Sequence, residues 1–147
     1  MNITVVGTGY VGLSLAVLLA QENTVTAVDI LPEKVKLINE RRSPIKDKEL
    51  EEYLRDRELH LTATTDADNA YRDADIIVVA APTNYDSRTN YFDTSAVEGV
   101  VDAALKANER ATVVIKSTIP VGYTAQLNAR KGTDRILFSP EFLRETR

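Results

Sequence analysis

Short apolar runs alternate along this chain with longer segments in which apolar residues recur at helical spacing. Several of the short runs are continuously apolar and β-branched, as strands buried on both faces should be. The predicted strands are Ile3–Val6, Val25–Val28, Leu61–Ala63, Ile76–Ala80, Thr112–Ile115 and Ile136–Phe138. Strands that alternate with helices predict an α/β fold, a doubly wound parallel sheet with its six strands in the order 3-2-1-4-5-6.

Three segments carry the periodicity of helices that bury one face. In one of them Ser95 and Glu98 have the spacing of a capping box. Its apolar residues follow at i, i+3, i+4, i+7 and i+8, namely Val97, Val100, Val101, Ala104 and Leu105. In the second segment Pro32 suits a first helical turn, with Val35 and Ile38 on one face. The third carries a smaller stripe in a charged segment, formed by Leu50, Tyr53 and Leu54.

The segment from Pro82 to Asp93 is polar and without periodicity, which predicts a loop. It follows the fourth strand, and open α/β sheets bind their ligands at the carboxyl ends of the strands. Pro120 and Pro140 also follow strands, at positions where a helix could begin. Ligand-binding groups are therefore expected at this edge of the sheet.

The composition indicates one globular domain, residues 1–147, with 44% hydrophobic and 27% charged residues. A net charge of -4 argues against nucleic acid or an anionic membrane as the main partner. No apolar run approaches the roughly 20 residues of a membrane span, and the first residues lack the basic region of a signal peptide.

A cytoplasmic protein is compatible with these features. The chain has no cysteine, so it contains no disulfide, thiolate metal site or thiol nucleophile, and no metal site is predicted.

A glycine-rich motif, Gly7-Thr8-Gly9-Tyr10-Val11-Gly12, separates the first strand from an apolar helix. Gly7 permits the tight turn, Gly9 lets a pyrophosphate approach the backbone, and Gly12 lets the helix pack closely on the strand. Free amides and the positive dipole at the helix start suit the phosphates. The motif is typical of the dinucleotide-binding turn of a Rossmann fold, although alone it is a weak signal. Tyr10 either contacts the cofactor or covers the helix start.

Asp29 strengthens this interpretation because of its place at the end of the second strand. It follows Gly12 by 17 residues (29 − 12), near the spacing of about 20 expected for the acid that binds the adenosine ribose. A carboxylate there would repel the 2′-phosphate of NADP, so NAD is the predicted cofactor. The alternative is that Asp29 caps the helix or turn ahead of Pro32. Lys34 either supplies a nearby cation or simply faces solvent.

Taken together, the motifs resemble those of the UDP-glucose/GDP-mannose dehydrogenase family. They occur in the family's order, as GTGYVG at 7–12, VDI at 28–30, APT at 81–83, KSTIPVG at 116–122 and SPEFLRE at 139–145. The last two are specific, since a generic Rossmann domain is not expected to carry either. The segment 84–93 resembles the UDP-glucose 6-dehydrogenase branch more than the others. The resemblance covers essentially the whole chain.

The resemblance implies oxidation of the C6 alcohol of UDP-glucose to a carboxylate, in two hydride transfers that use two NAD and a water. It implies an NAD site made by Gly7, Gly9, Tyr10, Val11, Gly12, Asp29, Lys34, Pro82, Thr83, Thr118 and Glu145. It places the sugar beside Glu141, Phe142, Leu143, Arg144 and Glu145. Thr118, Glu141 and Glu145 are implied as catalytic, with Thr118 and Glu141 acting through a bound water or as a general base.

The residues alone leave alternatives open at these positions. Thr83 and Thr118 follow strand ends, so each hydroxyl either reaches a ligand or caps a helix or turn. Glu141 and Glu145 are four apart and would share one helix face, which suits a general base, but two such glutamates are otherwise surface groups. His60, the single histidine, is expected at a strand entrance and not in catalysis.

At its end the chain departs from the family pattern. Thr146 stands where the family usually has glycine. The family's central helix and sugar-nucleotide domain, which hold its catalytic cysteine and most of its dimer interface, would follow Arg147. The 147 residues are therefore expected to bind NAD but not to oxidise UDP-glucose, to bind it only with a second domain, and to be monomeric although the parent enzyme is a homodimer. The alternatives are an NAD-binding regulatory or redox-sensing module, or the cofactor domain of a GDP-mannose or UDP-acetylmannosamine dehydrogenase.

Overall fold

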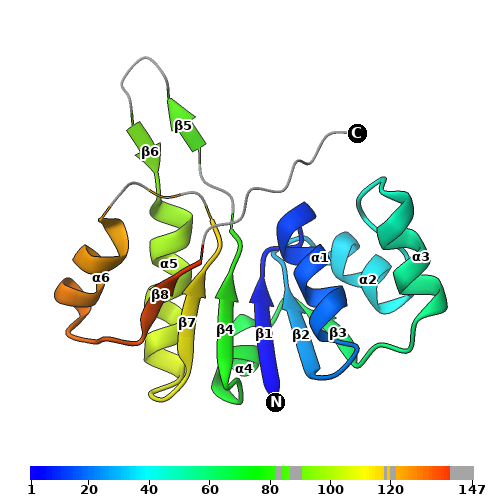
Figure 1. Cartoon of the computed structure of the whole chain (residues 1–147), viewed down its shortest axis with the longest axis horizontal. Coiled ribbons are helices and arrows are strands. Elements are labelled where there is room, and N and C mark those ends of the chain that lie inside the picture. Colours follow the sequence, from blue (N-terminus) through cyan, green and yellow to red (C-terminus); the bar gives the residue numbers. More distant parts are fainter. Residues whose placement is uncertain (82–83, 87–90, 118, 120–121, 140–147) are drawn as a thin grey trace.

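One sheet of six parallel strands runs through the protein (Figure 1). The computed structural model describes residues 1–81, 84–86, 91–117, 119 and 122–139. The strands are β1 (Asn2–Val6), β2 (Thr24–Val28), β3 (Leu61–Thr64), β4 (Ile76–Val79), β7 (Thr112–Ile115) and β8 (Ile136–Phe138). Their order across the sheet is β3-β2-β1-β4-β7-β8, so the predicted strand order is confirmed. Each predicted strand agrees with the observed one to within one residue at either end.

Helices cover both faces of this sheet, because successive strand residues point to opposite sides. On one side Val5, Val25 and Ala27 pack with three helices, α1 (Tyr10–Leu19), α2 (Pro32–Asn39) and α3 (Lys48–Asp56). On the other side Ile77, Val79, Val113 and Ile115 pack with α4 (Ala67–Arg72), α5 (Ser95–Ala107) and α6 (Tyr123–Lys131). The two apolar clusters give the sheet the doubly wound architecture that the sequence predicts.

The apolar stripe predicted for α5 is confirmed, since Val97, Val101 and Ala104 are fully buried. The predicted capping box is wrong. The N-cap is Thr94, which makes no side-chain cap hydrogen bond, and Ser95 is already the first helical residue. The carboxylate of Glu98 reaches across to α6, where it pairs with Arg130 at 3.2 Å. The glutamate of a capping box would instead reach back to the N-cap amide.

Two other predicted helices are confirmed, and Ile38 of α2 and Leu50 and Leu54 of α3 are buried. Pro32 occupies the first turn of α2, and Ile38 of that helix is fully buried. α3 begins after Asp47, whose carboxylate accepts a hydrogen bond from the amide of Leu50 at 3.0 Å. Pro120 and Pro140, the other expected helix starts, lie outside the described residues.

The structure adds three elements that the sequence pattern did not predict, namely one helix and the two strands of a hairpin. α4 is short and largely polar, so it shows no apolar periodicity, and it begins at an Asp66 cap. The segment from Pro82 to Asp93 was predicted to be a loop but contains an antiparallel hairpin, β5 (Asn84–Asp86) and β6 (Tyr91–Asp93). This hairpin follows β4 and stands above the carboxyl ends of the sheet strands (Figure 1). The predicted position was therefore right and the predicted conformation was wrong.

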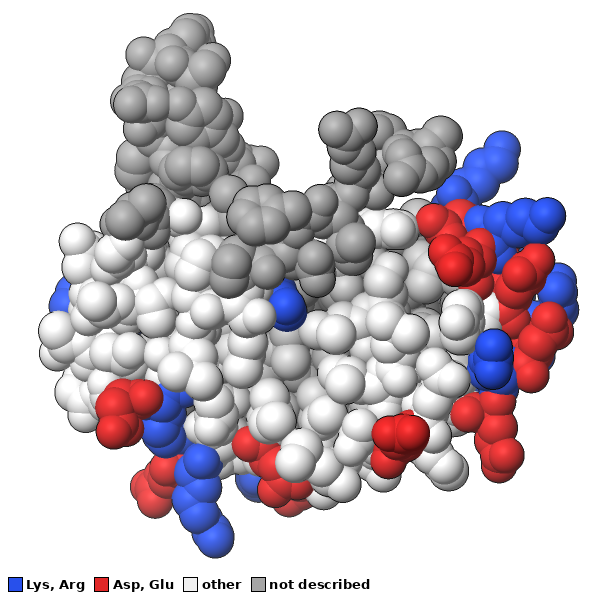
Figure 2. All heavy atoms as spheres, viewed as in Figure 1, with Lys and Arg blue, Asp and Glu red and all other residues white. Residues whose placement is uncertain are grey.

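Charged side chains of both signs gather at the end of the molecule that α2 and α3 form (Figure 2). The ion pair of Arg55 with Asp56, at 2.9 Å, is an exposed example. Exposed ion pairs of this kind contribute little to the free energy of unfolding. Among the residues that the structure describes, no helix is both long enough and apolar enough for a membrane crossing.

Candidate cofactor-binding site

Two glycines of the turn between β1 and α1 are required by the fold itself. Gly7 has a φ of 100°, and a Cβ there would lie 2.6 Å from the carbonyl oxygen of Ala80 on the neighbouring strand segment. A Cβ on Gly12 would collide with the carbonyl oxygen of Gly7. The predicted roles of Gly7 in the tight turn and of Gly12 in close helix packing are thus borne out by the geometry. The turn is tied to β2 by a hydrogen bond from the Gly7 amide to the Val28 carbonyl, 2.8 Å long.

Gly9, the middle glycine, has no such structural reason. Its φ of -72° and ψ of -171° are accessible to any residue. A Cβ built on it would meet no atom within 4 Å. Neither backbone strain nor packing among the described residues therefore demands glycine at this position. The geometry fits a group that approaches the bare backbone from outside, as a pyrophosphate would.

Among the residues that the structure describes, those at the start of α1 suit an anion. Gly9 is the N-cap, so it offers no side chain to the first-turn amides, and the first turn holds no acidic residue. Helix amides without a partner, at the positive end of the dipole, favour phosphate groups. Tyr10 packs against the apolar cluster under α1, which supports its covering role at the helix start. Val11 is half-buried beside it.

Asp29 lies next to this turn, and its carboxylate is held by three hydrogen bonds. Oδ2 accepts from the amide and the hydroxyl of Thr8, at 3.1 and 2.5 Å, and Oδ1 accepts from the amide of Leu31 at 3.0 Å. Burial raises the pKa of Asp29, but these hydrogen bonds and the charge of Lys34 outweigh burial, so the net pKa is lowered. The carboxylate is therefore ionised at neutral pH. Asp29 does stabilise the turn ahead of Pro32, which was the alternative interpretation. It also lies beside the glycine turn.

Asp29 has one predicted site residue, Lys34, and one residue that was not predicted, Ile30, near it. Lys34 is close enough for its charge to lower the pKa of Asp29, although this is the smallest of the contributions. Ile30 was not predicted as a site residue, yet 89% of its surface is exposed. An exposed isoleucine directly after Asp29 offers apolar surface to a ligand. In the sequence, Ile30 could have been found only as the residue that follows Asp29 in the VDI motif.

Several predicted residues lie outside the described part of the chain. They are Pro82, Thr83, Thr118, Glu141, Phe142, Leu143, Arg144 and Glu145. Their described neighbours do come together at the carboxyl edge of the sheet. The hydroxyl of Ser117 donates to the carbonyl of Ala81 at 2.5 Å, and Lys116 Nζ bonds Ser139 Oγ at 3.0 Å. The starts of the KSTIPVG and SPEFLRE segments are thus adjacent to each other and to the end of β4.

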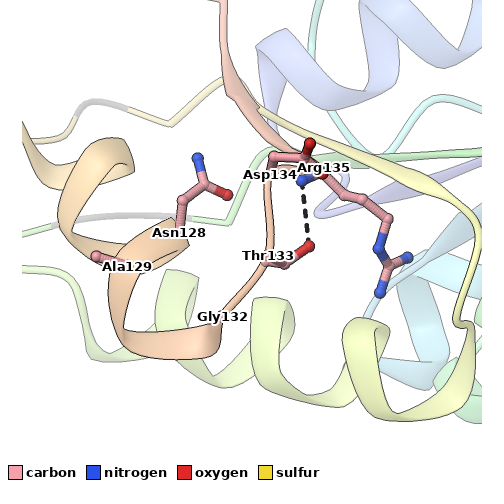
Figure 3. A pocket seen from close by; sticks show the side chains of 6 residues that line it. All are labelled: Asn128, Ala129, Gly132, Thr133, Asp134 and Arg135. Carbon is pink, nitrogen blue, oxygen red and sulfur yellow. Dashed lines mark hydrogen bonds between the residues drawn. The ribbon is translucent and has the colours of Figure 1, made fainter.

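Other polar features lie away from this edge. His60 is at the entrance to β3, as predicted, where its amide donates to the carbonyl of Ala20. A hollow at the α6–β8 turn is lined by Asn128, Ala129, Gly132, Thr133, Asp134 and Arg135 (Figure 3). Its polar side chains serve the fold, since Asn128 bonds the backbone of Ile136 and Arg135 donates to the carbonyl of Ala111. Among the described residues, no cluster of histidine and acidic side chains could hold a metal ion.

Residues 1–147 match the model of the UDP-glucose/GDP-mannose dehydrogenase family, NAD binding domain. A UDP-glucose 6-dehydrogenase of Streptococcus pneumoniae is 51% identical over 147 residues, which are 100% of this chain and 37% of that protein. The chain thus spans little more than a third of that relative.

Solved structures give the same picture. The chain is similar to a GDP-mannose dehydrogenase from Pseudomonas aeruginosa, solved as a ternary complex, with a TM-score of 0.82 and 30% identity. That match covers 98% of this chain and 37% of the other. A UDP-glucose dehydrogenase from the archaeon Pyrobaculum islandicum has a TM-score of 0.79 and 31% identity, over 97% of this chain and 36% of the other.

Proposed function

Because the chain belongs to the UDP-glucose/GDP-mannose dehydrogenase family and matches its NAD-binding domain, we propose that its glycine turn and Asp29 hold NAD for the oxidation of UDP-glucose. The observation that carries the proposal is the bare backbone at Gly9, for which the fold itself supplies no reason. NAD bound there would supply the hydride acceptor for oxidation of the sugar alcohol.

Three parts of the site would divide the binding of NAD among them. The amides at the start of α1 would take the pyrophosphate, with no acidic side chain in the first turn to oppose it. The ionised carboxylate of Asp29 would accept a hydrogen bond from the adenosine ribose. The exposed side chain of Ile30 would cover one face of the adenine. Thr83, Thr118 and Glu145, which the family resemblance implies, would complete the NAD site.

The proposed substrate, UDP-glucose, rests on similarity to a relative and on the place of residues 141–145 in the chain. The Streptococcus pneumoniae relative that is 51% identical is a UDP-glucose 6-dehydrogenase. Glu141 to Glu145 would border the sugar, and they continue from Ser139, which Lys116 holds beside the end of β7. The chain contains no cysteine, so the thiol nucleophile of such an oxidation would have to come from residues outside these 147. We therefore propose that these residues bind NAD without turning over UDP-glucose.

Titration calorimetry of the chain with NAD, NADP and UDP-glucose tests the proposal. NAD should bind, and NADP should bind more weakly because its 2′-phosphate would meet the charge of Asp29. Asp29→Ala should weaken NAD binding by about 1–3 kcal/mol, the scale of a hydrogen bond to a charged group. Absence of saturable NAD binding by the folded chain would overturn the proposal, and turnover of UDP-glucose by the pure chain would overturn its second half.

A matched pair of glycine variants separates the cofactor from the fold. Gly9 and Gly99 both have open space where a Cβ would stand, but Gly99 lies on the exposed side of α5. Gly9→Ala should leave the melting temperature unchanged and weaken NAD binding at least about tenfold, since the methyl takes the place of the phosphate. Gly99→Ala should keep full NAD affinity.

A further inference from the structure

Thr8 sits at a variable position of the glycine motif, yet its side chain is almost completely buried, with 1% of its surface exposed. Its hydroxyl and its amide both donate to the same oxygen of Asp29, Oδ2. The two residues are separated by 21 positions in the sequence and come from different strand ends. This hydroxyl therefore joins the phosphate turn to the ribose-binding acid.

We propose that Thr8 is a positioning residue that fixes the carboxylate of Asp29 for the adenosine ribose and thereby strengthens the preference for NAD over NADP. The inference rests on the proposed function. Thr8 is too deeply buried to touch a ligand, so it acts only through Asp29. No assignment of this kind follows from the motif, because G-x-G-x-x-G leaves the second residue free.

The geometry of the carboxylate shows how the preference arises. An ionised carboxylate accepts about four hydrogen bonds, and Thr8 and Leu31 occupy three of these positions. What remains is on Oδ1, so a ribose hydroxyl meets one defined acceptor. With Oδ2 held by two donors, the carboxylate cannot rotate away from a 2′-phosphate, and the repulsion between the two anions remains in full.

The charge of Asp29 is secured by the same contacts. Burial opposes ionisation of this carboxyl, and the Thr8 hydroxyl is the largest of the contributions that overcome burial and keep its pKa low. Lys34 contributes last. Loss of the Thr8 hydroxyl would therefore leave an acid that is less firmly ionised and held only by the amides of Thr8 and Leu31.

The experiment compares Thr8→Val, which keeps the shape and removes the hydroxyl, with Thr8→Ser, which keeps the hydroxyl. Binding of NAD and of NADP is measured by calorimetry, each alone and again in an Asp29→Asn background. Thr8→Val should weaken NAD binding about tenfold, as expected when a hydrogen bond to a charged group is lost. NADP binding should weaken less, so the ratio of the two affinities falls. Thr8→Ser should stay within about twofold of the parent chain.

The double variant distinguishes positioning from a general structural role. In the Asp29→Asn background, Thr8→Val should have no further effect on NAD binding, because the group through which it acts has lost its charge. Thr4→Val is the matched control. Its hydroxyl is also buried, at 2% exposure, and donates to the carbonyl of Ala70 at 2.6 Å, away from Asp29. It should lower stability and leave NAD affinity unchanged.

Two results would overturn the inference. One is an unchanged NAD affinity in Thr8→Val. The other is that Thr8→Val lowers NAD affinity by the same factor in the parent chain and in the Asp29→Asn background. Melting curves identify a variant that fails to fold, and Thr8→Ala then replaces Thr8→Val. If the parent chain and Thr8→Ser both bind NAD, these results count against the role of Thr8 alone. If the parent chain does not bind NAD, it is the proposed function that fails.

Discussion

The side-chain amide of Asn39 pairs with the backbone of Ala63 as a neighbouring strand would. Its Nδ2 donates to the Ala63 carbonyl at 3.0 Å, and its Oδ1 accepts from the Ala63 amide at 2.8 Å. Ala63 lies on β3, one edge of the sheet. At the other edge Asn128 makes the same two contacts with Ile136 of β8, at 2.9 and 3.2 Å. Each edge strand thus has a residue whose outward groups are occupied, which disfavours pairing with another chain there.

We predict that Asn39→Ala lowers the free energy of unfolding by about 1–2 kcal/mol, because it leaves the amide and carbonyl of the buried Ala63 without their partner. Urea denaturation measures the loss. Lys36→Ala, an exposed change on the same helix, should alter stability by less than about 0.5 kcal/mol. Equal stability of Asn39→Ala and the parent chain would show that water replaces the amide fully.

Gly12→Ala should destabilise the fold although helix propensity alone favours alanine. The propensity gain is about 0.5–1 kcal/mol in a helix interior. The new Cβ would however collide with the backbone oxygen of Gly7, and overpacking of this kind costs about 1–3 kcal/mol. The clash decides the sign, so the melting temperature should fall. The same change at Gly99 should raise it slightly, and a rise at both positions would contradict the prediction.

The strands could be predicted from the sequence because their continuous β-branched runs are typical of buried strands. Continuous β-branched runs such as Thr112–Ile115 gave strands with the observed bounds. The failures have physical reasons. α4 is too short and polar to show periodicity, and its Asp66 cap was not recognised. The strands of the β5–β6 hairpin are only three residues each, too short for an alternating pattern to distinguish them from a loop. The Ser95 capping box failed because Glu98 bonds α6, a contact distant in sequence.

In the candidate site the sequence was informative about backbone and less so about side chains. The roles of Gly7 and Gly12 followed from steric rules that the motif itself encodes. Asp29 followed from spacing. The Thr8–Asp29 contact could not be foreseen, because only the folded turn brings the end of β1 to the end of β2. Ile30 was overlooked because an exposed isoleucine has no signature beyond its place after the acid.

The lowered pKa of Asp29 predicts how stability responds to acid. Since the folded-state pKa is lower than that of the unfolded chain, ionised Asp29 contributes stability at pH values above about 4. This contribution is lost as the pH falls through the folded-state pKa. Asp29→Asn should therefore be less stable than the parent chain at pH 7, with a difference that narrows below about pH 4. Urea midpoints at pH 7, 5, 4 and 3 provide the test, and a constant difference would contradict it.

The raised pKa of Tyr71 predicts a loss of stability at alkaline pH, where that of Asp29 predicts a loss in acid. Burial, with a smaller effect from the charge of Asp68, raises the pKa of Tyr71 to about 12. In the unfolded chain this phenol ionises near pH 10, so the folded state is the one that keeps the proton. Its stabilising effect is present below about pH 10 and is lost as the pH rises towards 12. Tyr71→Phe should therefore flatten the fall in urea midpoint between about pH 10 and 12. If the variant lost stability as steeply as the parent chain, ionisation of Tyr71 would not be what limits the fold in alkali.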